Sequence, residues 1–200
     1  MMLQDKEDLI QALKNNCILS EHHEEIAEYL QPRCSPVIYQ KNTHFHIQSN
    51  NINNVLLLAY GALLETINNE NGDERAIDII KPGRAIGDYE VLSDSSMDMS
   101  MKLIISCKFF KIQASDYLSI IQKYNYWQKA LKCCQARISI TKKHLTALQL
   151  SNHEQKIKWA INQLRDKETN KLIARNIDIA SVIGCSKETV SRVMPTLSKD

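Results

Sequence analysis

Hydrophobic residues near the end of the chain recur every three or four positions and predict two short helices joined by a tight turn. The stretch covers residues 177–193 and reads IDIASVIGCSKETVSRV. Gly184 separates the two apolar runs, at a point where a backbone with positive φ is wanted. Ala180 is small enough for a close helix approach, and Val190 and Val193 face the first helix. This spacing is that of a helix-turn-helix.

The second of these helices carries a polar face opposite its valines. Ser186 suits the N-cap, and Glu188 falls in the first turn, near the positive end of the helix dipole. The exposed side consists of Lys187, Glu188, Ser191 and Arg192. A face of this size fits the major groove of DNA. The alternative is an ordinary helical hairpin in a larger core, which does not explain why four polar residues gather on one side.

The longest predicted helix, residues 127–150, contains neither Gly nor Pro. Its apolar or near-apolar positions step by four and three, as in a heptad repeat. We call this set the seam: Trp127, Leu131, Cys134, Ile138, Thr141, Leu145 and Leu148. At 1.5 Å per residue the segment is ~33 Å long. On this pattern alone, the seam either packs inside one chain or pairs two chains.

Between residues 37 and 112 the pattern changes to short strand-like runs separated by polar turns. Gly61 interrupts one of these runs, which indicates a bulge or a tight bend. Several strands at this spacing predict an antiparallel β-roll of the jelly-roll type. Further predicted features are a turn at 81–83, helices over 5–30, 115–124 and 153–165, and N-caps at Ser20 and Ser115.

Composition and charge change the picture in two ways. With 44% hydrophobic residues and no apolar run near the ~18–20 residues that span a bilayer, we expect a soluble protein. The first residues lack the pattern of a signal peptide, so we expect a cytoplasmic location and no membrane partner. Residues 1–127 hold 11 Lys/Arg and 17 Asp/Glu, whereas residues 128–200 hold 14 and 6, giving formal charges of −6 and +8. The basic end suggests a polyanionic partner.

Candidate metal and catalytic residues are sparse. The six cysteines form no C-x-x-C pair, so no zinc site is indicated, and in the cytoplasm we expect them reduced. His44 and His46 would share one face of a strand, but no third metal ligand is evident, and surface or half-buried histidines are the favoured interpretation. His22 and His23 are expected in solvent. No catalytic triad, Walker loop or H-E-x-x-H motif appears, so we expect no enzyme.

The run GCSKETVSRV resembles the recognition helix of the CRP/FNR family of bacterial transcription regulators, whose signature is Gly-[Cys/Leu/Met]-Ser-Arg-Glu-Thr-Val-[Ser/Gly]-Arg. The resemblance implies that Glu188 accepts from a cytosine amino group and that Arg192 binds a guanine. Lys187 would contact a guanine or a phosphate, and Ser191 would add a base contact. The implied phosphate-binding residues at the helix start are Ser186 and Thr189.

The run KPGRAIGDYEVL similarly resembles the family's phosphate cassette in a cyclic-nucleotide-binding sensor domain. Gly87 and Asp88 match its first half, with Asp in place of Glu. Where the family's Arg-Ser pair would grip the cyclic phosphate, the chain reads Met97-Asp98-Met99, and an acid there would repel the ligand. Thr141 falls where the long helix offers a hydroxyl to the purine. The candidate effector pocket is therefore Gly87, Asp88 and Thr141, with cyclic AMP not favoured.

The resemblance also implies the use of the long helix as a parallel homodimer seam, with Thr141 able to transmit a change from the pocket to the dimer. Some family members bind an iron–sulfur cluster through closely spaced N-terminal cysteines; here Cys17 is followed only by Cys34, so we expect no such cluster. The family usually continues into a two-stranded wing, whereas this sequence ends at Asp200, and Pro195 is expected to end the recognition helix near residue 193 or 194.

Together these features predict an α+β protein in three parts: a β-roll sensor domain (1–124), a dimerisation helix (125–150) and an all-α helix-turn-helix domain (151–200). The predicted function is a homodimeric transcription regulator that binds a near-palindromic double-stranded DNA site. Control would come from an effector other than cyclic AMP, or the protein would be constitutively competent. RNA polymerase is allowed as a further partner. The alternatives are a scaffold or ligand-sensing dimer with a vestigial helix-turn-helix and, third, a cyclic-AMP-responsive regulator.

Overall fold

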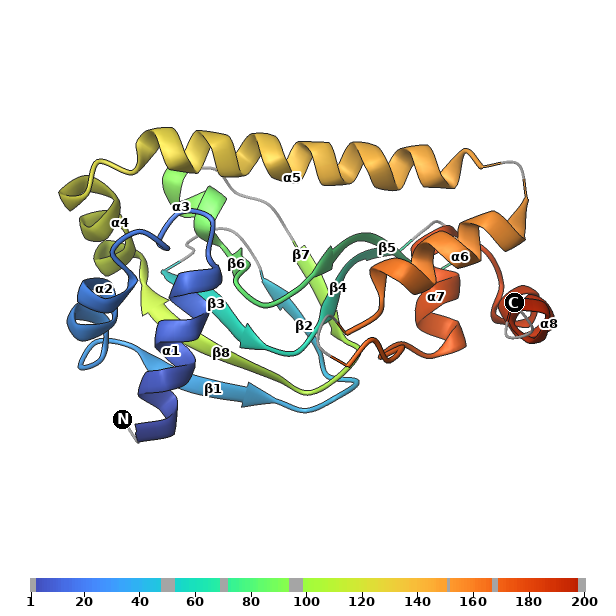
Figure 1. Ribbon diagram of the computed structural model, residues 1–200, viewed down its shortest axis with the longest axis horizontal. Helices are drawn as coiled ribbons and strands as arrows, with labels where there is room; N and C mark the ends of the chain where they lie inside the picture. Colours follow the sequence, from blue (N-terminus) through green and yellow to red (C-terminus); the bar gives the residue numbers. More distant parts are fainter. Residues whose placement is uncertain are drawn as a thin grey trace.

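The computed structural model describes residues 3–47, 53–68, 72–93, 99–150, 152–166 and 169–197. A β-roll with three short helices at one end forms the amino-terminal part of the molecule (Figure 1). One long helix, α5 (Trp127–Leu148), runs along the roll toward a cluster of three helices at the other end, where the chain finishes. The predicted α+β architecture is confirmed, with the long helix connecting the two parts.

The β-roll consists of two four-stranded sheets in which every pairing is antiparallel. One sheet has the order β1-β8-β3-β6 and the other β2-β7-β4-β5. The strands are β1 (Ser35–Tyr39), β2 (His44–Ile47), β3 (Asn54–Tyr60), β4 (Leu63–Asn68), β5 (Glu74–Ile80), β6 (Ala85–Ile86), β7 (Met99–Leu103) and β8 (Cys107–Gln113). Apart from the β4–β5 hairpin, neighbours in each sheet are not consecutive in sequence, as expected for the predicted roll.

The other helices are α1 (Leu3–Asn15), α2 (His23–Leu30), α3 (Asp88–Ser93), α4 (Ala114–Lys123), α6 (His153–Gln163), α7 (Asn176–Ile183) and α8 (Lys187–Leu197). Two predicted caps are wrong. The N-cap of α2 is His22 rather than Ser20, and that of α4 is Gln113 rather than Ser115. The Ser20 carbonyl instead lies 2.8 Å from Nδ1 of His23. Helix α6 does have a side-chain cap, because Asn152 Oδ1 accepts from the Gln155 amide at 2.9 Å.

Two predicted turns position the strands around them. Gly61 has φ +108°, and a Cβ there would stand 2.5 Å from the Cys107 sulfur. Gly83 has φ +85°, and its Cβ would stand 2.5 Å from the Asn15 carbonyl oxygen. Both sites combine a positive φ with close approach, so only glycine fits without rearrangement. The Asn16 side chain donates to the Gly83 carbonyl at 2.8 Å, which fixes the Lys81–Gly83 turn against the end of α1.

The carboxyl-terminal helices pack directly on the β-roll. One cluster of buried residues joins Leu64 and Ile104 of the roll with Ile161 of α6 and Ile179 of α7. A separate cluster unites α1, α2 and α4 with the β3–β8 sheet. The roll and the helix-turn-helix region therefore share a close-packed hydrophobic interface. Such an interface transmits strain from one part to the other.

The expectation that all cysteines are reduced is wrong for one pair. Cys17 and Cys133 form a disulfide across 116 residues, with a Cα–Cα distance of 5.9 Å. It ties the segment between α1 and α2 to the second turn of α5. The expected solvent position of His22 is also wrong, because its ring stacks on Tyr124 and its Nδ1 lies 2.5 Å from the Tyr126 hydroxyl. Spatial neighbours more than 100 residues away decided both outcomes.

Among the described residues, no helix has both the length and the apolar character needed to cross a membrane. The segment 94–98, which includes Met97 and Asp98, and residues 69–71 of the predicted Asn-rich turn lie outside the described residues. The departure from the family's Arg-Ser pair consequently remains a prediction from sequence.

Candidate functional site

Helices α7 and α8 form the predicted helix-turn-helix. Gly184 ends α7 in the left-handed conformation, with φ 70° and ψ 35°, and the Cys185 amide donates to the Ala180 carbonyl at 3.1 Å. Ser186 Oγ accepts from the Thr189 amide at 3.2 Å, so the predicted N-cap of α8 is confirmed. Val190 is completely buried between α8 and its neighbours. The turn, cap and packing valine therefore arise from the residues that the sequence motif singled out.

The predicted polar face of α8 is exposed. Ser186, Lys187, Glu188, Ser191 and Arg192 all lie at the surface, and Thr189 is half-buried beneath them with its hydroxyl 3.1 Å from Ser186 Oγ. Ser191 Oγ accepts from the Asn176 side chain at 2.9 Å, so α7 helps to orient it. These six residues form one contiguous surface, which we call the α8 face. Charged and hydrogen-bonding groups on such a surface can contact base edges and phosphates.

The prediction that Pro195 ends the recognition helix is wrong. Helix α8 continues through Pro195 to Leu197. A proline removes the hydrogen bond from its own nitrogen to the carbonyl four residues earlier, but it stops a helix only where this loss and the ring clash are not accommodated. Here it lies in the last turn, and Thr196 Oγ1 donates to the Val193 carbonyl at 2.6 Å. The α8 face is therefore backed by a longer helix than predicted.

Polar contacts fix the helix-turn-helix to the β4–β5 hairpin. The Lys102 ammonium group, on a side chain that is 8% exposed, lies 2.5 Å from Glu74 Oε2 and 3.6 Å from Asp178 Oδ1. Ser181 Oγ donates to the Glu74 carbonyl at 3.0 Å, and Arg75 Nη1 donates to the Cys185 carbonyl at 3.1 Å. These bonds set the orientation of α7, and hence of α8, relative to the roll.

The seam on α5 is largely exposed in the single chain. Leu131 is 71% exposed, Leu145 57%, Ile138 51% and Trp127 44%. Cys134 and Leu148 are half-buried, and Thr141 is exposed. Apolar side chains of this size arranged along one helix form a surface of the kind that marks association with another protein.

The first two candidates for an effector pocket lie where β6 passes into α3. Gly87 has φ 83° and precedes α3, of which Asp88 is the first residue. Asp88 is 1% exposed, and both its carboxylate oxygens accept from Arg137 of α5, at 3.0 Å from Nη1 and 2.6 Å from Nη2. The Asp88 carboxylate, a predicted effector-pocket group, is thus already in a bidentate ion pair with Arg137. Sequence reasoning missed Arg137, which is 49 residues away.

Acidic groups predominate around this ion pair. Burial, followed by the nearby Asp78 carboxylate, raises the pKa of Glu65, and burial also raises the pKa of Glu90. Arg84 Nη2 donates to Asp78 Oδ2 at 2.7 Å. In this described group, the carboxylates are Glu65, Asp78, Asp88 and Glu90, and the guanidinium groups are Arg84 and Arg137. Because each guanidinium is paired with a carboxylate, the surroundings do not favour a phosphate.

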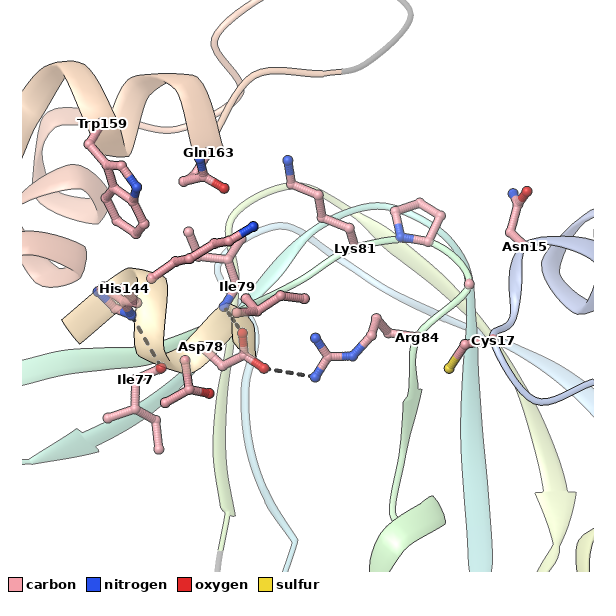
Figure 2. Close-up of a pocket in the computed structure, with 15 residues that line it drawn as sticks. Asn15, Cys17, Ile77, Asp78, Ile79, Lys81, Arg84, His144, Trp159 and Gln163 are labelled. Atoms are coloured by element: carbon pink, nitrogen blue, oxygen red, sulfur yellow. Dashed lines mark hydrogen bonds and ion pairs between the residues drawn. The ribbon is translucent and has the colours of Figure 1, made fainter. Parts of the chain in front are cut away.

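Thr141, the third pocket candidate, lies apart from Gly87 and Asp88. It lines a cavity of about 460 Å³ together with residues of β5, the Lys81–Arg84 turn, α5 and α6. Figure 2 shows Trp159 and Gln163 on the α6 side of this cavity, with Ile77, Asp78 and Ile79 of β5 facing them. Neither Gly87 nor Asp88 is among the residues that line it. The structure therefore does not bring the three candidates together in one pocket.

The two histidines of β2 each lie close to a polar side chain of another strand. His44 and His46 are both exposed, as favoured from the sequence. His44 Nδ1 lies 3.4 Å from Glu74 Oε1, and His46 Nδ1 lies 2.8 Å from Ser100 Oγ. Over the described ranges, no group of three or more His, Cys, Asp or Glu side chains is arranged to hold a metal ion.

Comparison with known proteins agrees with this architecture. No protein-family model matches the chain. The chain is 23% identical over 173 residues to the cyclic AMP receptor protein of Thermus thermophilus, which covers 86% of this chain and 76% of that protein. Two of the similar solved structures are FixK2 from Bradyrhizobium japonicum (TM-score 0.69, 15% identity, 83% and 85% covered) and the c-di-GMP-responsive regulator CLP of Xanthomonas campestris (0.68, 13%, 88% and 92%).

The fold shared with these structures is a β-roll followed by a long helix and a helix-turn-helix. Another structure with this fold, TTHB099 of the CRP family from Thermus thermophilus, matches with a TM-score of 0.67 at 12% identity over 82% of this chain and 84% of that one. In its recognition-helix motif and in its fold, the chain is similar to transcription regulators of the CRP/FNR type.

Proposed function

We propose that the protein acts as a homodimer that binds a near-palindromic double-stranded DNA site and regulates transcription in the cytoplasm. The observation that carries this proposal is the exposed α8 face, with Glu188 and Arg192 on a helix held by Val190 and the Ser186 cap. In this proposal Arg192 donates to a guanine and Glu188 accepts from a cytosine amino group. Ser186, Lys187 and Thr189 contact the backbone near the helix start, and Ser191 adds a base contact.

The charge of the chain supports this partner. Residues 128–200 carry the formal charge of +8 noted above, against −6 for residues 1–127. DNA binding releases condensed counterions in proportion to the phosphates that are neutralised, so the affinity should fall steeply with salt. A scaffold protein with a helix-turn-helix that no longer binds DNA would show no such dependence.

The seam supports the dimer. Leu131, Ile138 and Leu145 are each more than half exposed in the single chain, and burying one such side chain contributes roughly 1.5–3 kcal/mol. Two copies of α5 packed along the seam would place two α8 faces on one side of the dimer. They would then reach successive major grooves about 34 Å apart.

The Asp88–Arg137 pair supports control by an effector other than cyclic AMP, or constitutive competence. A cyclic nucleotide bound at Gly87 and Asp88 would have to displace a buried bidentate ion pair in acidic surroundings. The third alternative, a cyclic-AMP-responsive regulator, is tested by calorimetry. We expect no binding heat with millimolar cyclic AMP, and a saturable signal would establish that alternative instead.

Selection of binding sites from random double-stranded DNA tests the proposal directly, with and without cyclic AMP. We expect enrichment of an inverted repeat with half-sites one helical turn apart, and the same enrichment with or without the nucleotide. Enrichment of no sequence would support the scaffold alternative. Enrichment only with cyclic AMP would support the cyclic-AMP-responsive alternative.

Sedimentation velocity tests the dimer separately. Leu131→Asp should convert the dimer to monomer, because it places a charge in an apolar seam. Ile38→Asp is the matched control, since Ile38 is 56% exposed on β1, away from α5, and its replacement should leave the dimer intact. A wild-type protein that sediments as a monomer at micromolar concentration would contradict the homodimer.

A further inference from the structure

We propose that the cavity beneath Thr141 is a binding site for a small organic anion with a flat or apolar body. Its volume of about 460 Å³ falls within the range of about 300–1,000 Å³ that small-molecule sites occupy. It lies between β5, the turn before β6, and helices α5 and α6. In the proposed function this would be the effector site, but the binding itself does not depend on DNA recognition.

Apolar side chains form the walls that would hold the body of the ligand. Ile77 and Ile79 come from β5, Ile140 from α5 and Trp159 from α6. Trp159 is half-buried, and its ring stacks on His144 with centroids 5.1 Å apart. A planar or aliphatic group entering between these residues would remove apolar surface from water on both sides. The ring pair also gives one wall a flat surface, which favours a planar ligand.

The charged side chains of the cavity favour an anion. Lys81, Arg84 and Lys143 line it, against a single carboxylate, that of Asp78. Asp78 is neutralised by Arg84 at 2.7 Å and also accepts from the Ile79 amide at 2.7 Å, as the dashed lines in Figure 2 show. Lys143 is exposed at the α5 side and has no ion-pair partner among the residues that the structure describes. Because Arg84 and Asp78 neutralise each other, the Lys143 ammonium group supplies the positive charge that a ligand would meet.

Polar groups would complete the recognition of such a ligand. Within the described structure, the Nε–H donor of Arg84 is buried and has no hydrogen-bond partner. It lies in the same plane as the two other nitrogens of the guanidinium group. Gln163 and Asn15 present amide groups at opposite sides of the cavity, as Figure 2 shows. An unsatisfied buried donor costs free energy, so a ligand or solvent acceptor that reaches it is favoured.

One cavity residue connects this site to the helix-turn-helix. His144 is 6% exposed, and its ring nitrogens lie 3.3 Å from the Ile77 carbonyl oxygen and 2.8 Å from the Val182 carbonyl oxygen of α7. A ligand stacked against Trp159 and His144 would therefore touch the contact that links β5 to α7. Because the cavity is built from the sensor, α5 and α6 together, a ligand that fits it stabilises this arrangement over others.

Fluorescence of 8-anilinonaphthalene-1-sulfonate tests the site, because this probe combines flat rings with a fixed negative charge. The experiment uses the full chain with Trp127→Phe, which leaves Trp159 as its tryptophan. We expect saturable binding of one probe per chain with quenching of Trp159 emission. Lys143→Glu should weaken binding at least about tenfold, which corresponds to about 1.4 kcal/mol.

Two neighbouring residues provide matched controls. Lys142→Glu changes the adjacent exposed lysine, which does not line the cavity, and should leave binding within about twofold. On α6, Gln163→Glu places a negative charge at the cavity and should weaken the probe, whereas Asn162→Asp should not. N-phenyl-1-naphthylamine, with the same rings but no sulfonate, should bind more weakly than the sulfonate.

Two results would overturn the proposal. One is binding of the sulfonate that changes equally in Lys142→Glu and Lys143→Glu, which would place the probe on the general surface or the seam. The other is unchanged Trp159 emission at probe saturation. Either result can occur whether or not the protein binds DNA, so failure of this site and failure of the proposed function remain distinguishable.

Discussion

The α8 face and the Gly87–Asp88 region were both identified from family-like motifs, yet the first is exposed and the second is buried. Glu188 and Arg192 stand exposed on α8, where an external partner can reach them. Asp88 is 1% exposed and is paired with Arg137 of the same chain. A motif can therefore keep its backbone form while its chemistry is already satisfied internally. The difference indicates that the polar groups of the α8 face are available to a partner, whereas the Asp88 carboxylate is already occupied by Arg137.

The largest expected effect on stability comes from removing the Asp88 carboxylate from its ion pair with Arg137. Asp88→Ala leaves the Arg137 guanidinium without its bidentate partner on a side chain that is 13% exposed. Breaking one side of a buried ion pair costs about 3–5 kcal/mol of unfolding free energy. Chemical denaturation monitored by circular dichroism measures this loss.

An exposed ion pair provides the control for Asp88→Ala. Glu154 and Lys158 are about half exposed and lie 3.0 Å apart on α6. Glu154→Ala should cost less than about 1 kcal/mol, since solvent screens such pairs. If Asp88→Ala is no more destabilising than this control, the Asp88 carboxylate is open to solvent and the contrast with the α8 face fails.

The next largest effect is expected from the disulfide between Cys17 and Cys133. The sensor is tied to α5 by Cys17–Cys133, whereas Cys185 in the helix-turn-helix is buried and unpaired. Cys17→Ser should lower the free energy of unfolding by about 2–4 kcal/mol, because the bond restricts the unfolded chain.

The unpaired thiol of Cys34 provides the matched control, and burial raises its pKa to about 11. Cys34→Ser should leave the disulfide intact, and its change in stability should not depend on added dithiothreitol. Equal unfolding of wild type and Cys17→Ser without reductant, with free thiols found by mass spectrometry at both Cys17 and Cys133, would contradict the paired state.

The smallest effect is a pH dependence within the sensor. Burial raises the pKa of Glu65 above the ordinary value of 4.5, so the folded state binds this proton more tightly than the unfolded chain does. Stability from this group is present at low pH and is lost as the pH rises through the raised pKa. Glu65→Gln should stabilise the protein at pH 7 and have little effect near pH 4. An equal effect at both pH values would show that packing, rather than charge, sets the difference.

Local patterns allowed much of the fold to be predicted. The Gly184 turn, the Ser186 cap and the buried Val190 all follow from residues close in sequence, and the structure has each of them. The β-roll was predicted from strand spacing, and Gly61 and Gly83 mark the expected bends. Such features are set by backbone preference and short-range hydrogen bonds, which a single sequence displays directly.

Features that depend on distant neighbours were missed. Arg137 finds Asp88 across 49 residues, and Cys17 finds Cys133 across 116. Neither pairing has a local signal, because both require the packing of α5 on the roll. The extension of α8 through Pro195 was missed for a different reason. Pro195 lies in the last turn of α8, where the helix loses only the one hydrogen bond that the proline nitrogen cannot donate.

Binding of the selected DNA site by wild type and Arg192→Ala tests whether the α8 face reads the DNA sequence. Fluorescence anisotropy at fixed salt would compare them, with Arg33→Ala as a control because Arg33 lies over Tyr29 in the sensor. We predict that Arg192→Ala binds about 1–3 kcal/mol more weakly and loses selectivity at one base pair of each half-site, while Arg33→Ala binds as wild type does. Unchanged affinity and selectivity in Arg192→Ala would contradict the assignment of the α8 face as the DNA-reading surface.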